Sequence, residues 1–303
     1  MSSEVSVWSA RCLYSAAMLM AVVLAMAAMG ARPDSLVRAR IAEVPGARVA
    51  VAYRDLATRD SLVIDGDSSF HAASTMKVAV MIRLFRDIDA GRLRPDQPVP
   101  VTNRFASLVD GKPAFAADMK DDSDSSLYAR VGTRVPLDTL LDLMIQRSSN
   151  LATNTLIDLV GARRVDSTAH ALGAVHMRVR RGVEDSAAFA RGLNNTVTAR
   201  DLATLMQAIA EDRAASTASC HAMREILLGQ AFNTEIPAGL PPGTRVAHKT
   251  GQITGILHDA AIVYPVGRGP YVLVVLTGGI ADAHVAQHLI ADISTIVYAR
   301  ATR

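Results

Sequence analysis

Apolar and polar residues alternate at both ends of the chain, and this alternation predicts strands. In residues 48–54, Val49, Val51 and Tyr53 fall on one face, which is the period of two expected of a strand. Residues 60–64 follow at a hairpin's distance and are the expected partner. Near the C-terminus, strands are predicted at residues 244–249, 258–264 and 271–277, the last two dense in β-branched residues.

Between these ends, apolar residues recur at the period of a helix. A helix is predicted from Ser74 to Gly91, with Val78, Met81 and Ile82 on its buried face. Further helices are predicted at residues 34–43, 138–147, 150–160, 163–172, from 198 onward, 216–228 and 282–299. Residues 118–126 hold four Asp and three Ser. They lack the Gly and terminal Glu of a calcium-binding loop, so we expect a solvated loop.

The order of these elements predicts an α+β fold of the three-layer α/β type. Strands from both ends are expected to form one antiparallel sheet, with the terminal helices on one face and a helical subdomain inserted. We expect a single domain over residues 31–303. Its sheet subdomain covers about residues 31–90 and 235–303, and its helical subdomain about residues 91–234.

Residues 1–30 have the pattern of an export signal. Arg11 precedes an unbroken apolar run, and Ala28 and Gly30 stand where a signal peptidase prefers small residues. The run is shorter than a typical membrane span. We expect its removal, which leaves no stable membrane span and a periplasmic or secreted protein. An uncleaved anchor is the alternative, and no lipobox surrounds Cys12.

Composition excludes several classes of function. The net charge is +3 and the basic residues do not cluster, so nothing favours nucleic-acid binding. Without the signal, Cys220 is the one cysteine left, which excludes a disulfide within the monomer. The eight histidines lack metal-binding spacing, and His284 and His288 are expected on a solvated helix face. We expect no metal ion.

Lysine is rare in this chain, at four of the 32 basic residues. Arginine suffices for a permanent charge, whereas a buried lysine amine can lose its proton and act as a base. Two of the four lysines stand in short motifs, Ser74-Thr75-Met76-Lys77 and Lys249-Thr250-Gly251, and Ser148-Ser149-Asn150 lies between these motifs in the chain. These motifs are the candidate chemistry.

Ser74 and Lys77 are three residues apart at the start of a predicted helix, so both side chains lie on one face. A serine hydroxyl becomes a nucleophile when a neighbouring base takes its proton, and a partly desolvated amine can be that base. The helix N-terminus also offers N–H groups to a developing oxyanion. The alternative is an N-cap serine followed by a surface lysine.

Lys249-Thr250-Gly251 is expected at the end of a strand. Lys249 and Thr250 can hold a substrate carboxylate there, while Gly251 allows a substrate backbone to lie along the strand edge. The alternative is a strand that turns at glycine. Ser148 and Asn150 open a helix, where both residue types are also common caps. Each motif alone is a weak signal, but their order makes coincidence improbable.

The three motifs in this order resemble those of the class A β-lactamase family. The likeness extends over nearly the whole chain after the signal, including residues 70–74 (FHAAS), 148–157 (SSNLATNTLI), 198–206 (TARDLATLM) and 249–265. It implies that Ser74 is acylated, that Lys77 accepts or relays its proton, and that Ser148 passes a proton to the leaving nitrogen.

The resemblance also implies the substrate contacts. Asn150 bonds the substrate's side-chain amide, Lys249 and Thr250 receive its carboxylate, and Gly251 is part of the same substrate-binding motif. The N–H groups of Ser74 and Gln252 form the oxyanion hole. No cofactor is implied, the substrate is a small-molecule β-lactam or a peptidoglycan-like compound, and we expect a monomer.

The match weakens at the residue that deacylates the enzyme. The family carries a glutamate on its Ω-loop in an Arg-x-Glu-x-x-x-Asn setting. Glu184 lies at the usual interval, 34 residues beyond Asn150, but neither the Arg nor the Asn aligns. The alternatives are a surface glutamate paired with Arg180 or Arg181, or Asp185 in the same role.

Two further positions depart from the family pattern. Ser149 replaces the middle Asp of the Ser-Asp-Asn motif, and Leu257 stands where many members have an arginine. We expect an exported serine hydrolase of the class A β-lactamase type. A penicillin-binding DD-peptidase, or another amide or ester hydrolase that releases β-lactams slowly, is the alternative. A non-catalytic cell-wall module is the third hypothesis, but it predicts loss of Ser74 or Lys77, and both are present.

Overall fold

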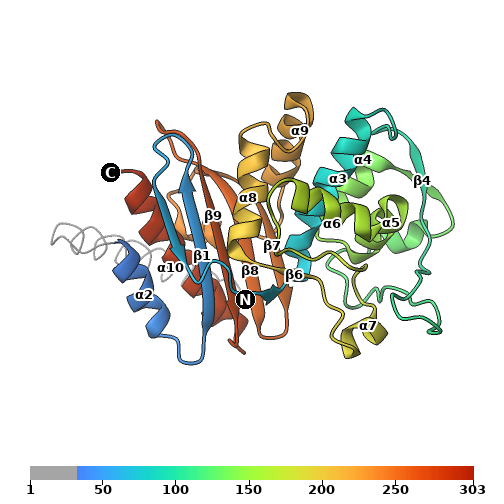
Figure 1. Ribbon diagram of the computed structural model, residues 1–303, viewed down its shortest axis with the longest axis horizontal. Coiled ribbons are helices and arrows are strands. Elements are labelled where there is room, and N and C mark those ends of the chain that lie inside the picture. The colour runs from blue at the N-terminus through green and yellow to red at the C-terminus, as the bar shows by residue number, and fades with distance from the viewer. Residues whose placement is uncertain (1–32) are drawn as a thin grey trace, which may run out of the picture.

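The computed structural model describes residues 33–303, with a sheet region and a helical region side by side (Figure 1). The expected signal, its cleavage site and the anchor alternative fall in residues 1–30, outside the described part of the chain. Within residues 33–303, no helix combines the length and the apolar character that a membrane crossing requires.

A five-stranded antiparallel sheet combines strands from both ends of the chain, in the order β2-β1-β9-β8-β7. The strands are β1 (Arg48–Asp55), β2 (Ser61–Ile64), β7 (Arg245–Ile253), β8 (Ile256–Tyr264) and β9 (Tyr271–Gly278). The two ends of the chain join where β1 pairs with β9, from Arg48 opposite Gly278 to Asp55 opposite Tyr271. The predicted sheet from both termini is confirmed.

Helices cover both faces of this sheet (Figure 1). They are α2 (Pro33–Ala42) and α10 (Ala283–Ala301) on one face and α8 (Ala199–Ala210) on the other. The period of two in β1 divides its side chains between the two faces. Val49, Val51 and Tyr53 join the core beneath the terminal helices, while Ala50 and Ala52 join the core that contains α8. The three-layer α+β prediction is confirmed.

The helical region follows the first strands in the chain. Its helices are α3 (Lys77–Asp89), α4 (Leu137–Gln146), α5 (Asn150–Val160), α6 (Ala162–Ala171), α7 (Ser186–Ala190) and α9 (Thr217–Leu228). Three short helices are η1 (Ala73–Met76), η2 (Ser126–Arg130) and η3 (Ile236–Gly239). Two small two-stranded sheets pair β3 (Phe70–His71) with β6 (Thr196–Val197), and β4 (Pro98–Pro100) with β5 (Arg134–Pro136). Periodicity predicted the longer helices and missed these short elements, since five residues or fewer carry too little pattern.

The prediction that a strand ends at Lys249 was wrong. β7 continues to Ile253, because Gly251 pairs with His258 and the pairing goes on to the end of the strand. The motif Lys249-Thr250-Gly251 therefore lies inside β7, which is the edge strand of the sheet. Glycine often ends a strand, but Gly251 is a paired residue within the β7–β8 ladder.

Candidate active site

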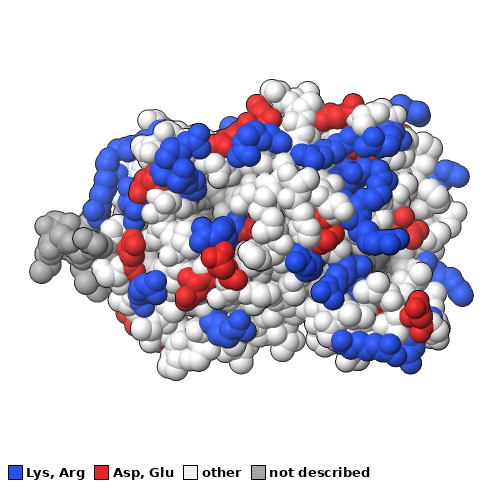
Figure 2. All heavy atoms as spheres, in the orientation of Figure 1, with Lys and Arg blue, Asp and Glu red and all other residues white. Residues whose placement is uncertain are grey.

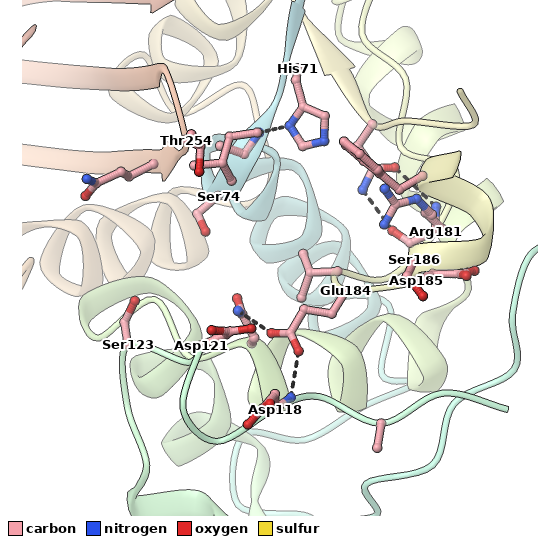
Figure 3. Close-up of a pocket in the computed structure, with 18 residues that line it drawn as sticks. His71, Ser74, Asp118, Asp121, Ser123, Arg181, Glu184, Asp185, Ser186 and Thr254 are labelled. Atoms are coloured by element: carbon pink, nitrogen blue, oxygen red, sulfur yellow. Dashed lines mark hydrogen bonds between the residues drawn. The ribbon is translucent and has the colours of Figure 1, made fainter. Parts of the chain in front are cut away.

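The motif residues meet where the edge strand β7 lies against the helical region. A pocket of about 670 Å³ opens there, with Ser74 on one side and Glu184 facing it from the other (Figure 3). A smaller pocket of about 130 Å³ shares Ser74, Ser123 and Gln252 with the first and extends toward Ser148. The structure thus brings together the three motifs that are far apart in the sequence.

Ser74 lies on a tight turn rather than at the start of a regular helix. The prediction of a helix from Ser74 is corrected, since η1 begins at Ala73 and α3 at Lys77. Ala73 has φ of 46°, a left-handed conformation that is strained for a residue with a Cβ. Its N–H donates to Nδ1 of His71 at 3.1 Å, which helps to hold the turn.

Gly251 is required for the approach of β7 to this turn. A Cβ at residue 251 would lie 3.0 Å from the backbone nitrogen of Ser74 and 3.0 Å from Cγ2 of Thr75. Few real Cβ atoms tolerate such contacts. From the sequence, Gly251 is predicted to let a substrate backbone lie along the strand edge. The structure shows that it also makes room for the protein's own turn at Ser74.

Lys77, Ser148 and Lys249 form one buried network. Lys77 is fully buried, and its Nζ donates to the carbonyl oxygen of Ser148 at 2.7 Å and to Oδ1 of Asn150 at 3.1 Å. Oγ of Ser148 lies 3.2 Å from Nζ of Lys77 and 3.1 Å from Nζ of Lys249. Ser148 also has φ of 59°, a strained backbone that this network holds in place. One hydroxyl therefore bridges two buried amines.

Burial weakens both amines as cations. Loss of solvent lowers the pKa of Lys77 well below its ordinary range, and the nearby charge of Lys249 lowers it further, against the opposing effect of Asp122 and Glu184. Burial likewise lowers the pKa of Lys249 to about 7, although Asp259 and Glu235 act to raise it. Lys249 can therefore exchange a proton near neutral pH, and the lowered pKa of Lys77 makes its neutral form accessible, whereas an arginine keeps its proton.

Glu184 faces the pocket and not the solvent-exposed surface. Its Oε1 accepts from Nδ2 of Asn150 at 2.6 Å, and its Oε2 accepts from the backbone N–H of Asp118 at 2.7 Å. Its backbone has φ of 67°, in the left-handed region. Burial raises the pKa of Glu184, and the carboxylates of Asp122 and Asp121 raise it further, against these two hydrogen bonds.

Two of the alternatives for this position, Arg181 as the partner of Glu184 and Asp185 as the base, do not fit the geometry. Arg181 directs its guanidinium to the carbonyl oxygens of Leu193 and Gly182 and to Asn194, so it is not the partner of Glu184. Asp185 is buried and caps α7, accepting from Ala188 N at 3.1 Å. Although burial opposes it, the pKa of Asp185 is lowered by its hydrogen bonds, so it is a structural anion.

Asp122 is a site residue that the sequence interpretation missed. Residues 118–126 were expected to be a solvated loop, but Asp118, Asp121 and Ser123 line the large pocket (Figure 3). The carboxylate of Asp122 accepts from the N–H groups of Asn150 and Leu151, each at 2.9 Å. It thus binds the N-terminus of α5, where an anion is stabilised by free N–H groups.

The carboxylate of Asp122 also stands in for the acid that the motif lacks at residue 149. Ser149 stands where the family pattern has Asp, and its hydroxyl donates to Asp122 at 3.3 Å while accepting from Ala152 N at 3.2 Å. Tyr128 donates a further hydrogen bond to Asp122 at 3.0 Å. In the sequence, the one sign of a site role for Asp122 is that residue 149 is Ser where the family pattern has Asp.

Thr250 and Gln252 complete the strand side of the site, and both line the smaller pocket. Lys249 itself stays behind them, with Nζ 2.9 Å from the carbonyl oxygen of Thr250. In residues 33–303, no group of three or more His, Cys, Asp or Glu side chains is arranged to hold a metal ion. On the face shown in Figure 2, basic side chains are interspersed with acidic ones.

The chain is similar to known proteins over most of its length. A family model described as the β-lactamase enzyme family matches residues 33–301. β-Lactamase Toho-2 of Escherichia coli is 28% identical over 235 residues, which are 76% of this chain and 75% of that protein.

Solved structures share the fold. A β-lactamase from Sphaerobacter thermophilus DSM 20745 superposes with a TM-score of 0.75 at 28% identity, over 88% of this chain and 97% of that one. The structure of PBP-A gives a TM-score of 0.76 at 26% identity, over 88% of this chain and 95% of that one. Because the family match spans nearly all of the described chain, this protein belongs to the β-lactamase enzyme family.

Proposed function

We propose that this protein is a serine β-lactamase of the class A type, which opens the β-lactam amide through an acyl-enzyme on Ser74. Its family and its relatives support the hydrolysis of β-lactams. The observation that carries the proposal is the hydroxyl of Ser148, held 3.2 Å from Nζ of Lys77 and 3.1 Å from Nζ of Lys249. This hydroxyl borders the same pocket as Ser74.

Acylation begins when the neutral amine of Lys77 takes the proton of Ser74. Oγ of Ser74 then bonds to the lactam carbonyl carbon, and the N–H groups of Ser74 and Gln252 stabilise the oxyanion. When the carbon–nitrogen bond breaks, the Ser148 hydroxyl gives its proton to the leaving nitrogen. Ser148 recovers a proton from the Lys77 ammonium, so the proton taken from the nucleophile ends on the product.

Deacylation requires a water molecule and a base on the other side of the ester. Glu184 is the carboxylate that faces Ser74 across the pocket (Figure 3). Asn150 links the group proposed for acylation to the group proposed for deacylation, since its side chain accepts from Lys77 and donates to Glu184. We assign Glu184 to orient and deprotonate the water.

A penicillin-binding hydrolase that releases its adduct slowly is the second candidate. It is favoured by the likeness to PBP-A, a mutant of which was solved as an acyl-enzyme complex with penicillin G. Both oxygens of Glu184 already accept short hydrogen bonds, from Asn150 and from Asp118. These bonds act against the rise in the pKa of Glu184 that burial causes, and they occupy both of its oxygens, which favours slow release.

Export and a monomeric state complete the proposal. Export rests on the sequence of residues 1–30, with its apolar run and small residues, and on the extracytoplasmic location of the peptidoglycan-like or β-lactam substrates. We place the mature enzyme in the periplasm or outside the cell. The third hypothesis, a non-catalytic cell-wall module, is disfavoured because it predicts the loss of Ser74 or Lys77, and both residues are present.

Replacing the nucleophile tests the proposed function directly. We expect Ser74→Ala to abolish both the acyl adduct seen by intact-mass spectrometry with penicillin and the hydrolysis of nitrocefin, because no hydroxyl remains to form the ester. Ser123→Ala, which removes a hydroxyl from the same pocket wall, is the control and should retain both. Nitrocefin turnover at the native rate in Ser74→Ala would refute the mechanism.

Glu184→Gln separates acylation from release. We expect the variant to form the adduct and to lose it about 100-fold more slowly than the native enzyme, because a general base is removed. Intact mass followed over time measures both steps. If the native adduct already persists and the substitution does not change its lifetime, the slow-release candidate replaces the β-lactamase assignment.

The pKa of Lys249 predicts an unusual pH profile. For a β-lactam with a free carboxylate, kcat/KM should fall as pH rises through about 7, because Lys249 loses its positive charge there. Lys77 acts as a neutral base, so its lowered pKa keeps acylation active at pH values where an ordinary lysine would still be protonated. Lys249→Arg keeps its charge and should move the falling limb to high pH. An unchanged falling limb in a folded Lys249→Arg protein contradicts this assignment.

Asp122 should position the catalytic groups without contacting substrate. We expect Asp122→Asn to slow acylation by about tenfold, because the N-terminus of α5 loses its anion. The carboxylate of Asp122 raises the pKa of Lys77, so its removal should also shift the rising limb of the acylation profile to lower pH. Asp121→Asn, an exposed carboxylate on the same loop, is the control. Slower acylation without that pH shift indicates a purely structural role.

A further inference from the structure

The turn that carries Ser74 is held by a side chain that the proposed mechanism does not use. Nδ1 of His71 accepts the N–H of Ala73 at 3.1 Å (Figure 3). Because an N–H group donates this bond, Nδ1 carries the lone pair, and the proton of the neutral ring is on Nε2. The imidazole thus accepts from a backbone group two residues farther along the chain, as the side chains of Asn and Asp do in turns.

His71 is itself held in place by three other elements. It lies in β3 opposite Thr196 of β6. Its carbonyl oxygen accepts from Nε2 of His258 at 2.9 Å, and His258 is fully buried in β8. Its ring meets the ring of Phe189 in α7 edge to face, with the ring centroids 6.2 Å apart. The imidazole is therefore anchored both at its backbone and at its ring.

Ala73 is the strained residue of this turn, with φ of 46° and only 7% exposure. The N–H groups on either side of the turn have other partners, since Ala72 donates to the carbonyl oxygen of Asn195 at 2.9 Å and Thr75 to that of Ala72 at 3.1 Å. The N–H that follows Ala73 is that of Ser74, which the proposed mechanism assigns to the oxyanion. Because a peptide unit is planar, rotation at Ala73 would turn this N–H as well.

We propose that neutral His71 is a positioning residue for acylation, whose Nδ1 holds Ala73 in the left-handed conformation that aims the hydroxyl and the N–H of Ser74. His71 acts through Ala73 and need not contact the substrate. This inference rests on the proposed function, because it concerns the same acylation step.

A second proton on the ring would remove this support. In an imidazolium both ring nitrogens are donors, so Nδ1–H of His71 would face the N–H of Ala73. Burial lowers the pKa of His71, and the guanidinium of Arg181 lowers it further. The ring is therefore a neutral acceptor at neutral pH, and it gains the second proton only as the pH falls below the usual range of histidine.

Other titratable groups surround His71. Arg181, Glu184 and Asp185 line the same pocket, and His258 meets the backbone of His71 from β8. Burial lowers the pKa of His258 to about 4, so this second histidine is also neutral near neutral pH. A variant changed only at residue 71 shares all of these groups with the native protein, so the ratio of the two acylation rates reports on the ionisation of His71.

Two substitutions of matched shape test the proposal. His71→Asn keeps an acceptor for the N–H of Ala73, whereas His71→Leu has the same branching without an acceptor. We expect His71→Asn to acylate within about threefold of the native rate, and His71→Leu about tenfold more slowly than His71→Asn, because the N–H of a buried residue loses its partner. Intact-mass spectrometry of rapidly quenched reactions with penicillin measures these rates.

The pH profile distinguishes this role from a purely structural one. The acylation rate of His71→Asn divided by the native rate should be constant near neutral pH and should rise as the pH falls through the lowered pKa of His71, since only the native ring gains a proton there.

Two results would overturn the inference: a ratio that stays constant at every pH where both proteins are folded, or equal rates in His71→Asn and His71→Leu. If His71→Leu does not fold, the pH dependence of the ratio alone decides. If the native protein forms no adduct on Ser74, the proposed function fails and the inference fails with it, whereas adducts without these differences overturn the inference alone.

Discussion

Two lysine amines buried against one serine hydroxyl set the conditions for the rest of this site. Lys77 and Lys249 are both fully buried and both reach Oγ of Ser148. Two full positive charges cannot persist so close together without solvent, so acidic residues must surround them. Asp122 and Glu184 favour the charged form of Lys77, while Asp259 and Glu235 do so for Lys249. The acids around the pocket are therefore part of the reason that the amines can be buried at all.

This arrangement depends on a close approach of two parts of the fold. The edge strand β7 supplies Lys249, and the serine turn before α3 supplies Ser74. They meet at Gly251, where any Cβ would press on the backbone nitrogen of Ser74. The left-handed backbone of Ala73 and of Ser148 is stored strain on either side of this contact. A site built from strained turns and a tight strand contact holds its groups in place before substrate arrives.

Much of this could be predicted from the sequence, because its signals are local. The period of two gave the strands, the period of 3.6 gave the longer helices, and the rarity of lysine drew attention to Lys77 and Lys249. Asp122 could not be found in this way, since it lies in an aperiodic loop and reaches α5 only through the fold. Glu235 is likewise buried, and the charged residue that acts on it most, Asp259, is distant in the sequence. The end of β7 was misplaced because glycine stops many strands, whereas Gly251 is kept for a contact that the sequence does not reveal.

The acylation core is held by buried hydrogen bonds, whereas Glu184 and Glu235, on either side of it, lie on irregular chain. Ser148 and Lys77 are held by buried hydrogen bonds between α5 and the start of α3. Glu184, by contrast, lies on irregular chain with a left-handed backbone, and Glu235 precedes the short turn η3. Changes in such segments disturb little of the core. The same serine chemistry can therefore be combined with a different base for release, or with a different side chain beside the strand, while the buried hydrogen bonds of the core stay in place.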